Sequence, residues 1–349
     1  HQCAIPCFML RKIWLMAGIV IVTAVAAEIA FRANLLEGLE NVYADLWHQA
    51  AGLRSQPTHT VIAAIDELTL RELNDEPLVF WSPYFAQAIQ VLREAGAAVI
   101  GLDIVFAVSA EAWFHRHFPD DPRSRNYDNA LRAQLAQGNV ILAGQLTPLE
   151  TSEQHYLVSL EDYLSMLPGQ AADVGLINMY PDPDGVVRHF IPAFTGADAN
   201  APGLGFGTLL ALRAAGQDPA GPVWTINGVE IPRTSAPHRI RFGGPPNSVP
   251  RLSFARLLSP HVADDPDIQR LKDKVVIIAA EALGTQDLHQ TPYSRTFFGR
   301  GGQFMAGPEL HANIIETLLT GRFPRPIPFW IRWLFLAGVL TLATVLFFR

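Results

Sequence analysis

Two long apolar segments, one at each end of the chain, limit what this sequence can fold into more than any other feature. Residues 13–31 (IWLMAGIVIVTAVAAEIAF) are uncharged until Glu28, and residues 329–348 (FWIRWLFLAGVLTLATVLFF) contain one charged residue, Arg332. A helix needs about 20 apolar residues to cross the hydrocarbon core of a membrane. The sequence therefore predicts two transmembrane helices, with residues 32–328 as a domain between them.

A secretory signal peptide is the alternative interpretation of the first segment. Its apolar stretch is long for a signal peptide and no small-residue cleavage site follows Glu28, which favours a membrane helix. Basic residues flank both segments on both sides, so charge bias leaves the orientation open. Apolar residues from Leu35 to Ala50 recur at three- and four-residue intervals, which predicts that the first helix continues as an amphipathic one ending near Gly52.

The region between the two segments is acidic. The chain has 26 basic and 33 acidic residues, and 22 and 32 of these lie in residues 32–328, a net charge of about −10. This balance argues against a nucleic-acid partner. The two cysteines, Cys3 and Cys7, precede the first segment, so the central region can form neither a disulfide nor a thiolate metal site.

Short apolar runs alternate with helical patterns along the central region. This alternation predicts an α/β fold with a largely parallel sheet covered by helices on both faces. Asn227-Gly228 between two β-prone runs predicts an antiparallel β-hairpin region. The predicted strands are 61–66, 97–106, 139–144 and 274–280, and the predicted helices are 83–96, 126–138 and 307–321.

Four carboxylates are the candidate ligand-binding residues. Asp66 ends the first predicted strand, Asp103 lies in the second, and Glu281 follows the last parallel strand, with Asp287 six residues later. The carboxyl ends of parallel strands meet at one edge, where open α/β sheets bind ligands. A buried Asp103 needs a partner, for which Arg188, a backbone amide, a cation or a ligand are the alternatives. The competing interpretation is that these acids cap helices and loops.

The stretch YPDPDGVVRHF contains a turn at Asp182-Pro183-Asp184-Gly185. Pro183 and Gly185 suit turn positions, and the following residues supply too few oxygen ligands for calcium. The sequence therefore favours a turn over a cation loop.

No catalytic, metal or cofactor site is predicted. His289 and His311, with Asp287 and Glu309, reach zinc-like spacing only through tertiary contact, and a packed histidine is favoured for His311. GLGFG (203–207) has no predicted strand before it and no lysine after it, so it does not fit a phosphate loop. The common hydrolase motifs are absent. A hydrolase built on Asp66, Asp103 and Asp287 is the least favoured class.

Several stretches together resemble the CHASE2 family of bacterial sensory domains. They are LENVYADL, VIAAID, LREAGAAVIGLDIVF, NMYPDPDGVVR, LKDKVVIIAA, DLHQTPY and GPELHANIIETLLTG, in the order of the family and covering most of residues 35–322. Two departures are Tyr84, where the family tends to have arginine, and the glycine-poor loop AAEALGTQD.

The resemblance implies a bacterial inner-membrane protein with a cytoplasmic tail (1–12), a transmembrane helix (13–31), an extracytoplasmic sensory domain (32–328) and a second transmembrane helix (329–348). It implies sensing of a ligand or protein partner and a cytoplasmic adenylate cyclase or protein kinase output beyond residue 349. A homo-oligomer or membrane complex and contact with membrane lipid are expected. The alternative function is a non-catalytic subunit that docks within a membrane complex.

Overall fold

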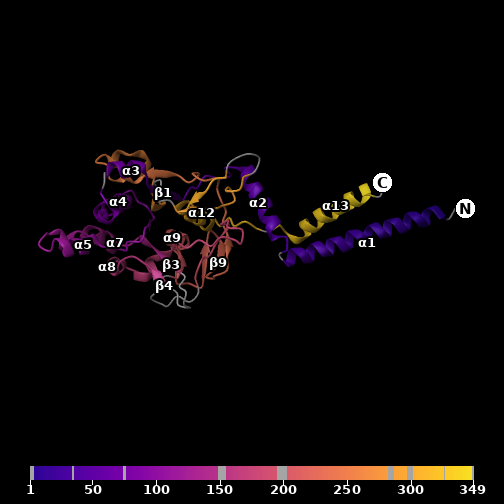
Figure 1. Ribbon diagram of the computed structural model, residues 1–349, viewed down its shortest axis with the longest axis horizontal. Coiled ribbons are helices and arrows are strands. Elements are labelled where there is room, and N and C mark those ends of the chain that lie inside the picture. Colours follow the sequence, from indigo (N-terminus) through magenta and orange to yellow (C-terminus); the bar gives the residue numbers. More distant parts are fainter. Residues whose placement is uncertain are drawn as a thin grey trace. The chain divides into compact units, whose positions relative to one another are not determined.

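The computed structural model describes residues 4–33, 35–73, 76–147, 155–194, 203–281, 287–296, 302–325 and 327–347. The chain divides into two compact units (Figure 1). One comprises His1–Trp47 and Pro324–Arg349, and the other, which we call the globular domain, is His48–Phe323.

The globular domain is built on one central sheet. Seven strands run parallel, and an eighth, β4, pairs antiparallel with β3. The seven strands, in spatial order, are β11 (Arg251–Ser253), β1 (Thr60–Ile65), β12 (Val275–Ala280), β2 (Val99–Asp103), β3 (Val140–Thr147), β5 (Val174–Leu176) and β7 (Leu204–Gly205); β4 is His155–Leu157. The predicted α/β class and parallel sheet are confirmed.

The last long strand is placed in the middle of the sheet. β12 lies between β1 and β2, with Ile65 opposite Ala280 and Ala279 opposite Asp103. Residues along these strands alternate between two buried clusters, so both faces of the sheet are covered. This explains why the strands read as nearly continuous apolar runs.

One face is covered by short and medium helices. Trp81, Phe85 and Ile89 of the α4 region pack against sheet residues such as Leu102 and Ile278. The helices on this side are α3 (Glu67–Glu72), α4 (Ser82–Glu94), α7 (Asn129–Ala136), α8 (Glu161–Leu164), α10 (Phe254–Leu257) and α11 (Pro266–Gln269).

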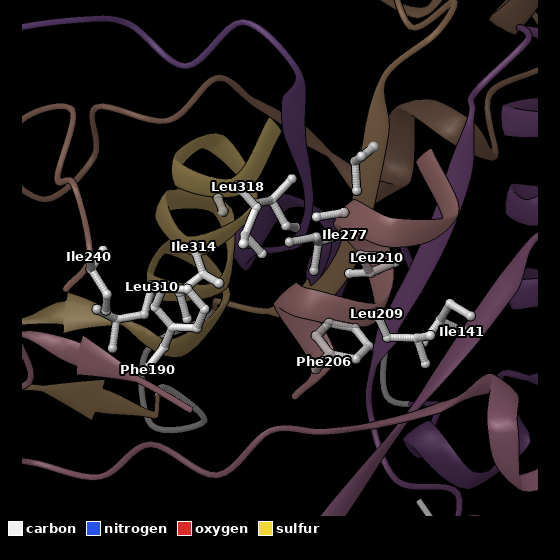
Figure 2. Close-up of a cluster of buried hydrophobic side chains, with 14 of the residues drawn as sticks. Ile141, Phe190, Phe206, Leu209, Leu210, Ile240, Ile277, Leu310, Ile314 and Leu318 are labelled. Carbon is white, nitrogen blue, oxygen red and sulfur yellow. The ribbon is translucent and has the colours of Figure 1, made fainter. Parts of the chain in front are cut away.

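The opposite face is covered by α9 (Phe206–Ala214) and α12 (Gly307–Thr320). Figure 2 shows Phe206, Leu209 and Leu210 of α9 between the strand residues Ile141 and Ile277, with α12 alongside. Two glycines let α9 approach the sheet closely. A Cβ at Gly175 would lie 2.6 Å from the Phe206 Cα, and one at Gly101 would lie 2.8 Å from Phe206 and Leu210 side-chain atoms.

Local sequence signals account for the ends of several elements. α12 has Pro308 in its first turn and ends at Gly321, which takes a left-handed conformation (φ 64°). The predicted hairpin is present, with Asn227 and Gly228 both at positive φ between β8 (Val223–Ile226) and β9 (Val229–Pro232).

Other elements are smaller. Two further antiparallel pairs are β6 (His189–Phe190) with β10 (His238–Arg239), and β13 (Leu288–His289) with β14 (Met305–Ala306). The segment 107–125, for which the sequence predicts neither a helix nor a strand, contains α5 (Ala110–His117) and the start of α6 (Arg123–Asn126). In the part of the chain that the structure describes, 3-10 helices lie at Leu78–Phe80, Gln170–Asp173 and Val262–Asp264.

The other unit contains α1 (Ala4–Arg32), α13 (Phe329–Phe347) and most of α2 (Glu37–Ala51). Among the described residues, two helices are long and apolar enough to span a membrane, Trp14–Arg32 and Phe329–Leu346. The predicted continuous helix through residue 50 is wrong, because turn residues separate α1 from α2.

The two apolar helices share an ion pair. The Arg332 guanidinium lies 2.9 Å from the Glu28 carboxylate and 3.8 Å from the centre of the Phe31 ring. Arg32 also contacts Glu28, at 2.9 Å. The one acidic residue of α1's apolar segment is therefore neutralised by a residue near the start of α13.

Candidate functional site

Three of the four predicted ligand residues lie at one edge of the sheet. Asp66, Glu281 and Asp103 follow or end the neighbouring strands β1, β12 and β2, whose register places their carboxyl ends side by side. Asp287 lies beyond the segment 282–286, which is outside the described residues. The four carboxylates differ in whether they have partners among the described residues, and this difference separates structural roles from a candidate binding role.

Asp66 is the N-cap of α3. Its carboxylate accepts hydrogen bonds from the Thr69 amide (2.9 Å), the Thr69 hydroxyl (2.9 Å) and the Ser253 hydroxyl (2.8 Å). Burial raises the pKa of Asp66, but these hydrogen bonds outweigh it and hold the pKa below its usual range. Its contacts fit the capping interpretation.

Glu281 belongs to an ion-pair network. Arg251 lies 2.9 Å from Glu281 and 2.8 Å from Glu309, whose side chain is only 1% exposed. The Glu309 carboxylate also accepts hydrogen bonds from the amides of Asn247, Ser248 and Val249. This network joins β11, the end of β12 and the start of α12.

Asp103 has a different environment. It is partly buried, on the face of the sheet that α9 and α12 cover, since it follows Val99 and Gly101 at two-residue spacing. Within the described residues its carboxylate has no hydrogen-bond partner. The Arg188 considered as a partner from the sequence instead binds Asp182 (2.8 Å) and Asp184 (2.9 Å), so that expectation is wrong.

Asp103, Asp287, His289 and His311 form what we call the acid–histidine cluster. The charges of Asp287 and His289 act on both Asp103 and His311. His289 Nε2 lies 2.9 Å from Asp287 Oδ2. The pairing of β13 with β14, with His289 opposite Met305, brings this pair to the start of α12. There, a Cβ added to Gly307 would lie 3.0 Å from Asp287 Oδ2.

The electrostatics of the cluster are unusual. Burial, together with the negative charge of Asp287 and against the charge of His289, raises the pKa of Asp103 to about 7. The hydrogen bond from His289 lowers the pKa of Asp287, against the effect of burial. Burial lowers the pKa of His311 to about 3, so its imidazole is neutral at physiological pH. The charge of Asp103 therefore changes near neutral pH.

A small hollow adjoins the cluster at the start of α9. It is lined by Asn178, Thr208 and His311, among others. Thr208 Oγ1 and His311 Nδ1 are both buried, and neither has a hydrogen-bond partner among the described residues. A buried polar atom without a partner is costly, so this is a place for a water molecule or a small polar group.

The cluster can hold or release a proton and can attract a cationic or hydrogen-bonding group. Among the residues that the structure describes, no three His, Cys, Asp or Glu side chains are grouped so as to hold a metal ion. Glu309, which the sequence placed near the two histidines, belongs to the Arg251 network. In the sequence, the DLH triplet at 287–289 contains two residues of the cluster. Its histidine can be recognised as a cluster residue only once the pairing of β13 with β14 is known.

The DPDG stretch is a turn, as predicted. The Gly185 amide donates to the Asp182 carbonyl (2.8 Å) and Gly185 has φ 81°. Both aspartates are held by basic side chains, Asp182 by Arg188 and His189, and Asp184 by Arg188 and Arg295. These partners lower the pKa of Asp184 to about 2.

Fold and site together define a class: an α/β domain with an open, titratable sheet edge, set in the sequence between two apolar helices. The family model of the CHASE2 domain matches residues 18–347, so the chain belongs to the CHASE2 family of sensory domains. No curated protein and no solved structure matches the chain.

Proposed function

We propose that this chain is the sensory part of a bacterial signal-transduction protein anchored in the inner membrane. Its globular domain lies on the extracytoplasmic side and the two apolar helices carry the signal to a cytoplasmic adenylate cyclase or protein kinase. The match to the CHASE2 domain over nearly the whole chain is the observation that carries the proposal. The two flanking helices support it, because each is long enough to span a membrane.

Within this proposal, sensing centres on the acid–histidine cluster. Of the four predicted ligand carboxylates, Asp103 and Asp287 lie in the cluster, whereas Asp66 and Glu281 hold neighbouring elements in place. A ligand that binds one conformation of the domain better than another would shift the population between them. Asp103, with its raised pKa, is the group whose charge a ligand would change most readily.

Cysteine labelling tests the topology directly. The globular domain contains no cysteine, so Glu230→Cys, at an exposed position of β9, introduces a single reporter once Cys3 and Cys7 are replaced by alanine. We expect a membrane-impermeant maleimide to label Glu230→Cys of this variant in intact spheroplasts. In the native chain, we expect the same reagent to label Cys3 and Cys7 only after permeabilisation. Labelling of Glu230→Cys only after permeabilisation would contradict the extracytoplasmic placement.

A fusion tests the transmission of a signal. An adenylate cyclase catalytic domain joined after residue 349 should give cyclic AMP output that differs between the native chain and the Asp103→Asn/Asp287→Asn variant. Asp218→Asn, in a surface turn after α9, is the matched control and should behave as the native chain. Equal output from all three fusions, at equal expression, would count against sensing at the cluster.

A non-catalytic docking subunit is the second candidate. Leu39, Tyr43 and Trp47 recur at four-residue spacing on α2 and are all more than half exposed. Such an apolar helix face suits a protein contact. Stable co-purification with other membrane proteins after mild detergent extraction would favour this candidate, whereas isolation as a homo-oligomer would favour the sensor.

A further inference from the structure

The globular domain contains a second polar cavity, distinct from the acid–histidine cluster. It has a volume of about 250 Å³ and is enclosed by the segment 55–58, by Arg241, and by the C-terminal half of α12 with Arg322. No residue of the acid–histidine cluster lines it, and the two sites share only α12.

Positive charge gathers in this cavity without a matching carboxylate. Among the described residues, no carboxylate oxygen lies within 4 Å of the guanidinium nitrogens of Arg241 or Arg322. Burial, followed by the like charges of Arg322 and Arg54, lowers the pKa of Arg241. Arg241 therefore feels the like charge of Arg322, the other arginine of the cavity wall, and of Arg54 outside it, which is unfavourable for Arg241 unless an anion is present.

The acidic residue in the cavity wall is already occupied. Glu316 accepts hydrogen bonds from the amides of His59 (2.6 Å) and Thr60 (3.0 Å), and its second oxygen lies 3.0 Å from His59 Nδ1. It neutralises part of the positive charge in the cavity but offers no ion pair to either arginine. Lys274, whose Nζ donates to the carbonyl of Thr58, lines a separate pocket and is not counted among the cations of this cavity.

A general basic surface does not explain this grouping, because residues 32–328 have a net charge of about −10. The planar guanidinium group presents paired donors that match the oxygens of phosphate. The cavity volume is below the range of about 300–1,000 Å³ typical of sites for drug-sized ligands. Both features favour a compact, highly charged anion.

We propose that this cavity binds a phosphate-type oxyanion between Arg241 and Arg322. The chemistry is shared by a soluble phosphate compound and by the headgroup of an anionic lipid.

The position of the cavity along the chain gives this binding a consequence. Residues 55–58 follow the end of α2 at Ala51, and Arg322 precedes the start of α13 at Phe329 by seven residues. Residues 55–58 and Arg322 both line the cavity, so an anion in it lies against both segments through which the chain continues from the globular domain to the apolar helices. Binding would restrict these two segments relative to each other.

Thermal unfolding of the full chain in nanodiscs tests the proposal. The native chain in phosphatidylcholine discs is titrated with sodium phosphate at constant ionic strength, with chloride as the balancing anion. We expect the Tm of the native chain to rise with phosphate concentration. In Arg241→Gln and in Arg322→Gln we expect the apparent Kd for phosphate to rise about tenfold or more, because each variant loses one charged contact to the anion. Arg322 is exposed, so its variant keeps the test usable if Arg241→Gln does not fold.

Two controls separate this site from other effects. Arg116→Gln, which removes an exposed arginine of α5, should retain the native phosphate response. Asp103→Asn should retain it as well, because the acid–histidine cluster lies outside the cavity; this separates failure of the anion site from failure of the proposed sensing site.

The source of the anion is resolved by the lipid. If the Tm of the native chain rises when phosphatidylcholine discs are replaced by phosphatidylglycerol discs, and this rise is lost in both arginine variants, the anion is a lipid headgroup. This outcome supports the proposal, as does a response to phosphate. No stabilisation of the native chain by phosphate or by phosphatidylglycerol would overturn it, and so would equal stabilisation of the native chain and both variants.

Discussion

At the residue scale, two aspartates at the same sheet edge have opposite electrostatic behaviour. Asp66 is surrounded by hydrogen-bond donors, which lower its pKa, and Asp103 has no donor among the described residues, so burial raises its pKa to about 7. The difference is one of neighbours rather than of residue type or strand position. It identifies Asp103 as the group for which ionisation costs stability.

The first prediction concerns Asp103→Asn. Between the usual aspartate pKa of 3.8 and about 7, the folded state binds a proton that the unfolded state has lost, so the free energy of unfolding falls as pH rises through this window. Asn removes this loss. We expect Asp103→Asn to have a higher Tm than the native chain at pH 8.5, by about 2–4 °C for each kcal/mol of unfolding free energy that ionisation of Asp103 removes. At pH 5 we expect a smaller difference in Tm.

Asp66→Ala is the contrasting variant. It removes the N-cap of α3 and should lower the Tm at pH 8.5, because a lost cap costs about 1 kcal/mol. Differential scanning fluorimetry of the three proteins at the two pH values measures both effects. A Tm advantage of Asp103→Asn that is absent at pH 8.5, or equal at both pH values, would show that Asp103 is not destabilised by ionisation.

At the scale of elements, α12 depends on one buried carboxylate near its first turn. Glu309 accepts hydrogen bonds from three successive loop amides and from Arg251, and it thereby fixes the loop before β11 to the helix. α12 also contributes His311 to the cluster and Glu316 to the anion cavity. The orientation of α12 thus affects both proposed sites.

We predict that Glu309→Gln destabilises the globular domain strongly. The amide group of glutamine places a donor where the native carboxylate meets only donors, and it leaves Arg251 with one carboxylate fewer. Breaking a buried ion pair in this way costs about 3–5 kcal/mol. Thermal unfolding measures the loss, with the exposed Glu230→Gln of β9 as control; equal Tm values for the two variants would contradict the prediction.

Elements with strong local signals were predictable from the sequence. The four long strands, α4, α12 and the Asn227-Gly228 hairpin follow from apolar runs, from proline at helix starts and from glycine at helix ends. The insertion of β12 between β1 and β2 was not predictable, because the pairing order of parallel strands depends on tertiary packing rather than on periodicity. α5 was missed because its polar and aromatic residues show little periodicity.

The candidate site was predictable only in part. Strand ends placed Asp66, Asp103 and Glu281 at one edge, but the sequence did not reveal which carboxylates find structural partners. Arg188 is bound by aspartates four and six residues away, and a short-range turn thus prevailed over the long-range pair with Asp103. His289 was considered only as a metal ligand, and its place in a cluster with Asp103 was not predicted, because β13, which positions it, is only two residues long.

At the scale of the whole molecule, the contact between Glu28 and Arg332 joins the two apolar helices. An ionised residue in an apolar helix is costly unless it is paired. We predict that Glu28→Gln and Arg332→Gln each destabilise the full chain in nanodiscs, and that the double variant is less destabilised than the sum of the two. The reason is that each single change leaves one charge without its partner.

A double-mutant cycle on Tm in phosphatidylcholine nanodiscs measures this coupling. Arg349→Gln, beyond the apolar stretch of α13, provides a control for the removal of a basic residue. Strictly additive effects of the two single changes would mean that the pair does not join the helices in lipid.

Because Glu28 lies in the last turn of α1 and Arg332 in the first turn of α13, the joined helices have a pivot at one end. Motions that keep this contact are limited to scissoring about it and to twisting around each helix axis, whereas sliding of one helix past the other by a full turn would separate the charges. A small change of angle at the pivot produces its largest displacement at the opposite ends of the helices, near the start of α1 and the end of α13. In the proposed sensor, an output domain on that side of the membrane would therefore experience mainly a change in the spacing between those two ends.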